Sequence, residues 1–238
     1  MQLRSRLGFL PSRSLCSQWA DALNIVIAHP AAVACALVDA AVLIPVKDFR
    51  QAKARLANVL APHDRLRLAR WTADRVVAAA SPLPVFIACD DRDVANWAEA
   101  HGATVLWSPG RGLNAAVHDG IATLAAGGIE HVIVAHSDLP TPAPLANIVL
   151  SGGIVLVPDL RDDGTNVIAI PSRVGFQPSY GSQSFRRHLA QAVSLGRPVR
   201  VHRDIRLALD IDTPPDLAHP LVAKVLPEWL QMNPVNQA

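Results

Sequence analysis

The sequence predicts an α/β fold in which a mostly parallel, Rossmann-like sheet is flanked by helices. From residue 41 onward, short apolar runs typical of buried strands alternate with amphipathic stretches. This alternation is typical of parallel βαβ units joined by right-handed crossovers. The chain has 238 residues, half of them hydrophobic, which is enough for one full core. We therefore expect a single domain over residues 39–238.

The first half of this region has a regular order of elements. Strands are expected at 41–46, 84–88, 103–107 and 131–135, and helices at 63–80, 93–100, 113–126 and 142–150. Every residue of 41–46 is apolar, which indicates a strand buried on both faces. The second half is less regular, with strands expected at 153–157, 165–170 and 198–202 and a helix at 182–194.

Residues 1–38 contain no convincing strand, and we expect a poorly ordered extension or an over-long start assignment there. The apolar stretch 24–46 is interrupted by His29, Pro30 and Asp39, so no clean run of about 18 apolar residues is available to span a membrane. Pro11 and Ser12 likewise break the apolar region that a signal peptide requires. The sequence therefore predicts no membrane partner.

Charge and cysteine content narrow the choice of partners and compartment. The net charge is only +2 and aromatic residues make up 5%, which argues against a nucleic-acid partner. Cys16, Cys35 and Cys89 are odd in number and lack metal-binding spacing, so we expect reduced cysteines and a cytoplasmic protein.

In an open parallel sheet, ligands bind beyond the carboxyl ends of the strands. No P-loop, no GxGxxG after the first strand and no GxSxG elbow is present at these positions. Lys47, Lys53 and Arg55 follow the first strand, and such cations suit a triphosphate. A solvated basic turn is the alternative interpretation.

Carboxylates occur at two further positions where a hard cation could bind. Asp138 follows the apolar strand 131–135, and it suits either a divalent cation or the cap of the next helix. Asp210 and Asp212 alternate across Ile211, so an extended backbone points both to one face, where they repel unless a cation lies between them. Asp212 could instead cap a helix that opens at Pro214. His136 is expected to be a turn or supporting residue rather than a ligand.

Two short polar segments are candidates for contacts to an anion. The run 163–166 (Asp-Gly-Thr-Asn) precedes a strand, and the run 181–184 (Gly-Ser-Gln-Ser) opens a helix whose backbone N–H groups could face an anion. Taken alone, a β-turn is the better explanation of the first segment and an ordinary serine cap that of the second.

Taken together, these segments resemble the guanylyltransferase family that makes the phospho-hydroxyacid arm of the deazaflavin coenzyme F-420. Members are called 2-phospho-L-lactate or phosphoenolpyruvate guanylyltransferases. The resemblance rests on an ordered set of motifs: Ile44–Lys47, Ala52–Leu56, Gly112–Ala116, Asp138–Pro140, Asp163–Asn166, Tyr180–Gly181 with Ser184, Phe185 and His188, and Leu209–Pro214 with Asp216 and Leu217.

The resemblance implies a nucleotidyltransferase fold of the glycosyltransferase-A-like type, as in molybdenum-cofactor guanylyltransferase. It also implies transfer of GMP from GTP to a small phosphorylated carboxylic acid, with Mg²⁺ as cofactor. By matching position, Lys47, Lys53 and Arg55 would be the catalytic cations that face the triphosphate. The other implied assignments are Gly112, Leu113 and Asn114 for the nucleotide, Asp138, Asp210 and Asp212 for the metal, and Thr165, Gly181 and Ser184 for the acceptor.

The chain departs from the family pattern at Gln183, which stands where a second glycine is usual, and at the polar lead-in His136-Ser137. We expect the Gln183 side chain to shrink or re-aim the acceptor pocket. Phosphoenolpyruvate is the default acceptor, with 2-phospho-L-lactate and 3-phospho-D-glycerate as alternatives. A molybdopterin or sugar-phosphate acceptor on the same fold, or a non-catalytic nucleotide-binding module, are the competing functions. The sequence does not indicate the oligomeric state.

Overall fold

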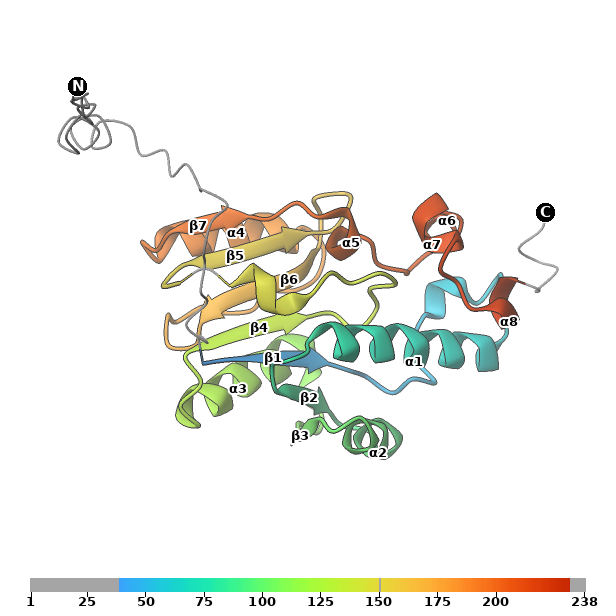
Figure 1. Cartoon of the computed structure of the whole chain (residues 1–238), viewed down its shortest axis with the longest axis horizontal. Helices are drawn as coiled ribbons and strands as arrows, with labels where there is room; N and C mark the ends of the chain where they lie inside the picture. The colour runs from blue at the N-terminus through green and yellow to red at the C-terminus, as the bar shows by residue number, and fades with distance from the viewer. Residues whose placement is uncertain (1–38, 150, 232–238) are drawn as a thin grey trace, which may run out of the picture. The chain divides into compact units, whose positions relative to one another are not determined.

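The computed structural model describes residues 39–149 and 151–231, which form a seven-stranded sheet with helices on both faces (Figure 1). Along the sheet the strands lie in the order β3-β2-β1-β4-β6-β5-β7. Their bounds are Ala40–Pro45 (β1), Val85–Cys89 (β2), Thr104–Trp107 (β3), His131–Ala135 (β4), Ile154–Pro158 (β5), Thr165–Pro171 (β6) and Val199–Val201 (β7). The longer helices are Pro62–Ala79 (α1), Arg92–Ala100 (α2), Gly112–Ala126 (α3) and Ser184–Ser194 (α4).

One strand runs against the rest, and this decides which residues meet at the site. The pairs β1–β2, β2–β3, β1–β4 and β5–β7 are parallel, whereas β6 is antiparallel to both β4 and β5. Ala135 at the end of β4 pairs with Val167, near the start of β6. The first residues of β6 therefore lie at the edge of the sheet where the parallel strands end.

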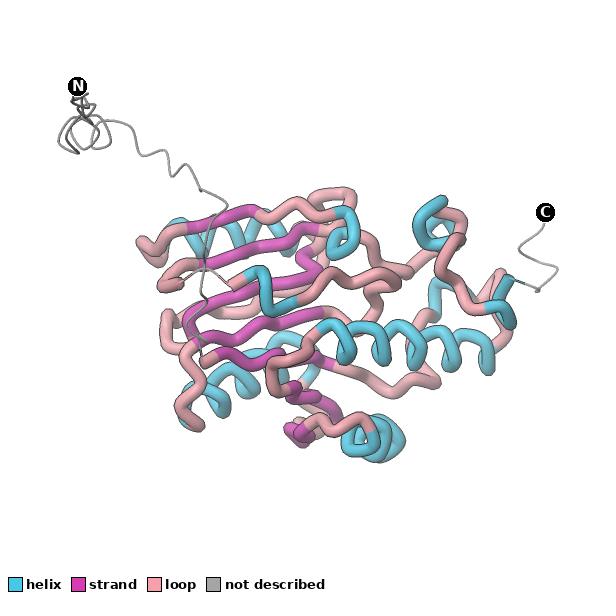
Figure 2. Tube along the Cα trace, viewed as in Figure 1, coloured by secondary structure: helices cyan, strands magenta, loops and turns pink. Residues whose placement is uncertain are grey.

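Alternation along β1 explains the two hydrophobic layers. Val42 and Ile44 belong to a core that contains residues of α1 and α2, and Ala41 and Leu43 belong to a second core that contains residues of α3 and α4. All four side chains are fully buried, as the unbroken apolar run predicts. Figure 2 shows the helices on either side of the strands.

Helix α3 packs closely on β1 because it has a glycine at the contact. A Cβ atom on Gly120 would lie 2.7 Å from a methyl carbon of Leu43, closer than side chains tolerate. The start of α3, Gly112 and Leu113, lines a recess together with Pro45 and Val46 at the end of β1.

The C-terminal part forms a third apolar cluster that covers the loop after β1. Short helices at Ile205–Ala208 (α5), Pro214–Leu217 (α6), Pro220–Ala223 (α7) and Glu228–Gln231 (α8) follow β7. Leu209, Ile211 and Leu226 pack there with Leu56 and Leu68. This cluster attaches the segment carrying Asp210 and Asp212 to the segment carrying Lys53.

The predicted α/β sheet is confirmed, but the helix expected at 142–150 is wrong. Only a 3₁₀ turn, Leu145–Ile148 (η2), forms there. Pro142 and Pro144 disfavour helical backbone in the residues before them, so no α-helix can begin between them. Helix α4 also begins at Ser184 rather than 182, because Gln183 has left-handed backbone with φ 57°.

Two further expectations meet the structure only in part. The predicted extension over residues 1–38 lies outside the described residues, as do Cys16 and Cys35, whereas Cys89 is free and buried. Among the described helices, none has the length and apolar character needed to cross a bilayer.

Candidate active site

A cleft opens at the carboxyl ends of the strands and consists of neighbouring cavities. One, of about 210 Å³, is lined by residues 45–47 at the end of β1 and by Lys53. Another, of about 480 Å³, is lined by Thr165, Tyr180 and Gly181. Leu113, His136, Asp138 and Asp212 line both cavities, so these residues form the border between the two halves of one site.

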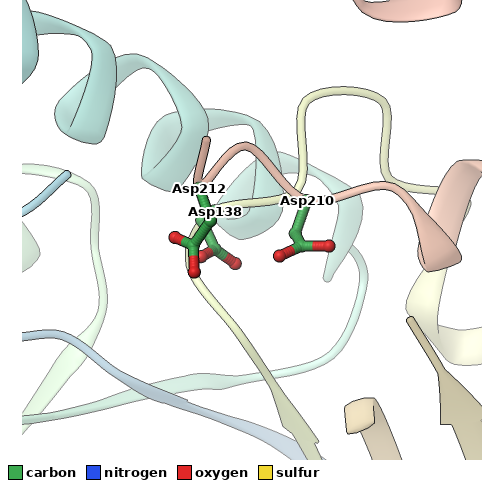
Figure 3. Close-up of side chains that lie close together, drawn as sticks. All are labelled: Asp138, Asp210 and Asp212. Atoms are coloured by element: carbon green, nitrogen blue, oxygen red, sulfur yellow. The ribbon is translucent and has the colours of Figure 1, made fainter. Parts of the chain in front are cut away.

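Three carboxylates meet at this border (Figure 3). Asp138, Asp210 and Asp212 each offer an oxygen within 4.8 Å of the others. Asp138 follows β4, and no α-helix begins after it, so the structure does not support its interpretation as a helix cap. Thr213, rather than Asp212, caps the helix at Pro214, together with Asp216.

The local sequence explains why Asp210 and Asp212 share a face. Leu209 and Ile211, which alternate with them, are 1% and 0% exposed and pack into the C-terminal cluster. The Ile211 N–H donates to the Asp138 carbonyl over 3.2 Å, which fastens this segment beside the end of β4.

A buried asparagine fixes the approach to this segment. The Asn166 side-chain amide donates to the carbonyls of Leu207 and Ala208, at 3.1 and 3.0 Å. Asn166 thus holds the chain just before Asp210, a role that the Asp-Gly-Thr-Asn motif alone did not reveal.

Lys53 supplies the positive charge of the cluster. Its Nζ lies 3.1 Å from Asp138 Oδ2 and 3.6 Å from Asp212 Oδ1, and its side chain is only 5% exposed. The residue has φ 58°, an uncommon conformation for a side chain other than glycine. Phe49 and Leu56, both buried, anchor the loop on either side of it.

The electrostatics of the three carboxylates differ. Burial raises the pKa of Asp210 to about 7, and the charges of Asp138 and Asp212 add to this effect. Burial alone would also raise the pKa of Asp138, but the Lys53 ammonium together with His136 and hydrogen bonding outweighs it, and the pKa of Asp138 is lowered. The cluster therefore carries more negative charge than its one buried lysine, Lys53, can balance.

The other two predicted cations, Lys47 and Arg55, differ in whether they pair with a carboxylate. Lys47 is exposed, lines the smaller cavity and forms no ion pair with a described residue. Arg55 has a side chain 74% exposed, and its Nη1 lies 3.7 Å from Asp212 Oδ2. The structure thus brings Lys53 and Arg55 to the carboxylates and leaves Lys47 open to the cleft.

The three residues predicted to bind the nucleotide are placed differently from one another. Gly112 and Leu113 line a small recess of about 60 Å³ beside Lys47. The Asn114 side chain instead brackets the backbone of Tyr180, accepting from its N–H at 2.6 Å and donating to its carbonyl at 3.3 Å. Both polar ends of the Asn114 side chain are used in this contact.

The three residues predicted to bind the acceptor all line the larger cavity. Thr165 and Ser184 are 1% and 2% exposed, and Gly181 has φ 120°, which favours glycine. Thr165 joins the site because β6 is antiparallel, so that its first residue lies at the end of β4.

The expected effect of Gln183 on the pocket is wrong. Its side chain is exposed and is absent from the lining of the cavity. Its own N–H donates to Asp163 Oδ1 at 2.9 Å, and the N–H groups of Ser184 and Phe185 donate to the carbonyls of Gly181 and Asp163. These N–H groups at the start of α4 are thus already satisfied, which leaves hydroxyl groups as donors to an anion.

The sequence reasoning missed Arg161 and gave no role to Tyr180. Arg161 lines the larger cavity and its guanidinium donates to Asp216 Oδ1 at 2.7 Å. The Tyr180 ring packs against His136 with centroids 4.9 Å apart. The only signal for Arg161 was its position just after a strand.

Comparison with known proteins identifies the family of the chain. A family model described as "Guanylyl transferase CofC like" matches residues 40–223. A phosphoenolpyruvate guanylyltransferase of Sphaerobacter thermophilus is 36% identical over 184 residues, covering 74% of this chain and 89% of its own. One of Chloroflexus aggregans is 35% identical over 188 residues, covering 72% and 91%.

Solved structures extend the similarity to the fold. A nucleotidyl transferase from Methanothermobacter thermautotroptrophicus superposes with a TM-score of 0.55 at 14% identity, covering 75% of this chain and 94% of its own. A synthetase for CMP-2-keto-3-deoxy-manno-octonic acid, complexed with CTP, gives 0.52 at 14% identity, covering 79% and 99%. The fold is that of the nucleotidyltransferases, and with the family model matched across the whole described sheet, the chain belongs to the CofC-like guanylyl transferases.

Proposed function

We propose that this protein transfers GMP from GTP to the phosphate of phosphoenolpyruvate with release of pyrophosphate, as a step of coenzyme F-420 biosynthesis. The observation that carries the proposal is the Asp138–Asp210–Asp212 cluster with Lys53 at the border of a two-part cleft. The relatives named phosphoenolpyruvate guanylyltransferase support the choice of acceptor. We place the reaction in the cytoplasm and the whole activity in a single domain over residues 39–238.

The carboxylate cluster fits a magnesium ion. Asp138 Oδ1 is buried and has no hydrogen-bond partner among the described residues. The raised pKa of Asp210 shows that its charge is unfavourable where it stands, and a divalent cation would relieve that cost. Mg²⁺ takes carboxylate oxygens together with substrate phosphates. When bound, it would supply neutralisation of the charge on the reacting phosphates.

The smaller cavity suits the nucleotide. Lys47 is the open cation beside it, and Gly112 and Leu113 form the adjoining recess. Lys53 and Arg55, already near Asp212, would face the phosphates at the border. We assign the contacts of Asn114 to positioning the loop at Tyr180 rather than to direct binding.

The larger cavity suits the phosphorylated acid. Thr165 and Ser184 offer hydroxyl donors, and Gly181 gives the acceptor close access to the backbone. Arg161 lines this cavity, as Arg55 does, and its guanidinium could meet a carboxylate.

The reaction requires positioning more than proton transfer. An acceptor phosphate oxygen attacks the α-phosphorus of GTP, a new P–O bond forms, and the bond to the β-phosphate oxygen breaks. The nucleophile is already an anion, so no general base is needed. The chain holds the two substrates on either side of the carboxylates, and the lysines and arginines stabilise the charge that moves to the leaving pyrophosphate.

The test measures pyrophosphate release from GTP and Mg²⁺, with phosphoenolpyruvate, 2-phospho-L-lactate and 3-phospho-D-glycerate in separate reactions. We expect release with phosphoenolpyruvate and a product whose ³¹P spectrum shows a diphosphate diester. Reactions with CTP or without acceptor serve as controls. A folded sample that binds GTP but stays silent with all three acids would contradict the proposal.

Variants connect this activity to the site. Asp138→Ala should abolish turnover while the circular dichroism spectrum is unchanged. Lys53→Ala should raise the KM for GTP, because a cation next to the phosphates is lost. Normal turnover in Asp138→Ala would refute the metal assignment.

A further inference from the structure

A buried histidine lies directly behind the acceptor cavity. His188, on α4, is 0% exposed, and its Nδ1 lies 3.0 Å from the hydroxyl oxygen of Thr165. Its other ring nitrogen, Nε2, lies 2.9 Å from the backbone nitrogen of Ser179. The ring thus bridges the loop before Gly181 and the first residue of β6.

These two contacts fix where the ring proton sits. A backbone N–H can only donate, so Nε2 must carry a lone pair toward Ser179. Burial, and then the Arg187 charge, lower the pKa of His188 to about 4, so the ring is neutral near pH 7. Its single proton is therefore on Nδ1, and it points at the oxygen of Thr165.

The tautomer in turn sets the direction of the Thr165 hydroxyl. Because Nδ1–H donates to Oγ1, the Thr165 hydrogen cannot point back at the histidine. No other hydrogen bond of this hydroxyl exists among the described residues, and Thr165 lines the cavity. The hydroxyl hydrogen is therefore available to an oxygen of a molecule in that cavity.

The ring is held in this orientation by its neighbours. Phe176 and Tyr180 pack against His188 with ring centroids 5.4 and 5.0 Å away. A flipped ring would set a carbon-bound hydrogen against the Ser179 N–H, and a ring protonated on Nε2 would set a second N–H there. The packing and the hydrogen bonds therefore favour one tautomer in one orientation.

A directed donor matters because the cavity is mostly acidic. Asp138, Asp159, Asp163, Asp210 and Asp212 all contribute to its lining. A phosphorylated acid enters against these charges, so each group that can only donate to it improves binding. A freely rotating hydroxyl could turn its lone pairs to the anion, whereas one that already accepts from Nδ1–H presents its hydrogen.

We infer that His188 is a positioning residue of the acceptor site, holding Thr165 as a hydrogen-bond donor to the carboxylate or phosphate of the acceptor. The inference rests on the proposed function for the identity of the acceptor. It assigns His188 no contact with the substrate and no part in proton transfer.

Two variants test the contact of His188 with Thr165 separately from its contact with Ser179. In His188→Asn, the side-chain N–H₂ can stand at the place of Nδ1–H and still donate to Thr165. In His188→Gln, the longer amide can stand at the place of Nε2 and accept from Ser179 while the bond to Thr165 is lost. Both replace the ring by a neutral amide, so they lose similar packing and serve as matched controls.

Steady-state kinetics with GTP, Mg²⁺ and phosphoenolpyruvate give the main readout. We expect the KM for phosphoenolpyruvate to rise about tenfold or more in His188→Gln, as for a hydrogen bond to a charged group, with the KM for GTP unchanged. His188→Asn should recover most of this loss. Adding His188→Gln to Thr165→Val should cause no further rise, since the hydroxyl is already absent.

A merely structural role gives a different pattern. In that case both amide variants would lower the melting temperature alike and leave the KM for phosphoenolpyruvate equal to that of the wild type, which would overturn the inference.

A second measurement does not depend on activity. Long-range ¹H–¹⁵N NMR of the wild-type histidines should show the Nδ1–H tautomer for His188, assigned by its loss in His188→Gln. An Nε2–H or doubly protonated ring at pH 7 would overturn the inference. If the wild type releases no pyrophosphate with phosphoenolpyruvate, the proposed function fails while this spectrum still decides the role of His188.

Discussion

At the scale of single residues, the charge of Asp210 in the carboxylate cluster lowers the stability of the metal-free protein. Asp210 is held beside Asp138 and Asp212, and burial with these charges raises its pKa to about 7. In the unfolded chain the same carboxyl ionises at its ordinary, much lower value. Between these two pKa values the folded state therefore carries a proton on Asp210 that the unfolded chain has lost. The free energy of unfolding falls as the pH rises toward about 7.

Asp210→Asn should remove this cost. We expect the metal-free variant to unfold with a free energy about 1 to 3 kcal/mol higher than the wild type at pH 8, with the difference shrinking toward pH 4. Urea titrations at several pH values in the presence of a chelator measure it. Turnover should be lost in the same variant. A stability difference that does not change with pH would contradict the electrostatic explanation.

Gln183 is a second residue that lowers the stability of the folded protein, because of its backbone conformation. Its φ of 57° is left-handed, and its exposed side chain does not line the cavity, so the side chain offers no contact there to offset the strain of the backbone. Gln183→Gly should raise the free energy of unfolding by about 0.5 to 1 kcal/mol. Gln183→Ala keeps the strain and should give no gain, which makes it the control in denaturant titrations. Equal stability of both variants would argue against strain.

At the scale of elements, the loop that carries Gly181 is held from two helices. His188 reaches Ser179 from α4, and Asn114 reaches Tyr180 from the start of α3. Both contacts join segments far apart in the sequence. The acceptor side of the site is therefore built by cross-links between elements rather than by the loop itself.

Asn114→Ala should show the strength of one cross-link. It leaves the N–H and the carbonyl of Tyr180 without their partner, so we expect a loss of about 1 to 3 kcal/mol in the free energy of unfolding. Asn114→Asp retains the acceptor for the N–H and should recover part of the loss. Thermal melting of the three proteins at pH 7 makes the comparison. A melting temperature of Asn114→Ala equal to that of the wild type would show that water replaces the amide.

The same elements show what the sequence can and cannot predict. Apolar periodicity located the strands and long helices, because burial of one face requires it. Alternation across Ile211 also placed Asp210 and Asp212 together correctly. Apolar spacing did not reveal that only a 3₁₀ turn forms after Pro142 and Pro144, because it does not report the restriction that a proline places on the backbone of the residue before it. Nor did it reveal the reversed direction of β6, because strand direction depends on pairing between distant segments.

At the scale of the whole molecule, the reversed strand β6 is what brings the two halves of the site together. Its start lies at the end of β4, so Thr165 and Asn166 join residues that follow the parallel strands. The folded protein also buries several histidines. Burial lowers the pKa values of His131, His136 and His188. Global stability must therefore respond to acid.

His188 gives the clearest prediction of that response. Its folded pKa of about 4 lies below its ordinary value of 6.5, so between these pH values the unfolded chain binds more protons than the folded one. Stability contributed by the neutral ring is fully present above about pH 6.5 and is lost as the pH falls toward 4. The shift corresponds to about 3 kcal/mol.

The experiment compares the free energy of unfolding of the wild type and His188→Gln between pH 4 and 7. The amide does not titrate, whereas Asp210 and the other histidines contribute equally to both proteins, so the difference isolates His188. We expect the advantage of the wild type at pH 7 to shrink by about 3 kcal/mol on acidification, since only the wild-type ring must resist a proton. A difference that stays constant over this range would mean that the ring takes up a proton in the folded state as readily as in the unfolded chain, and the single-tautomer bridge between Ser179 and Thr165 could not then exist.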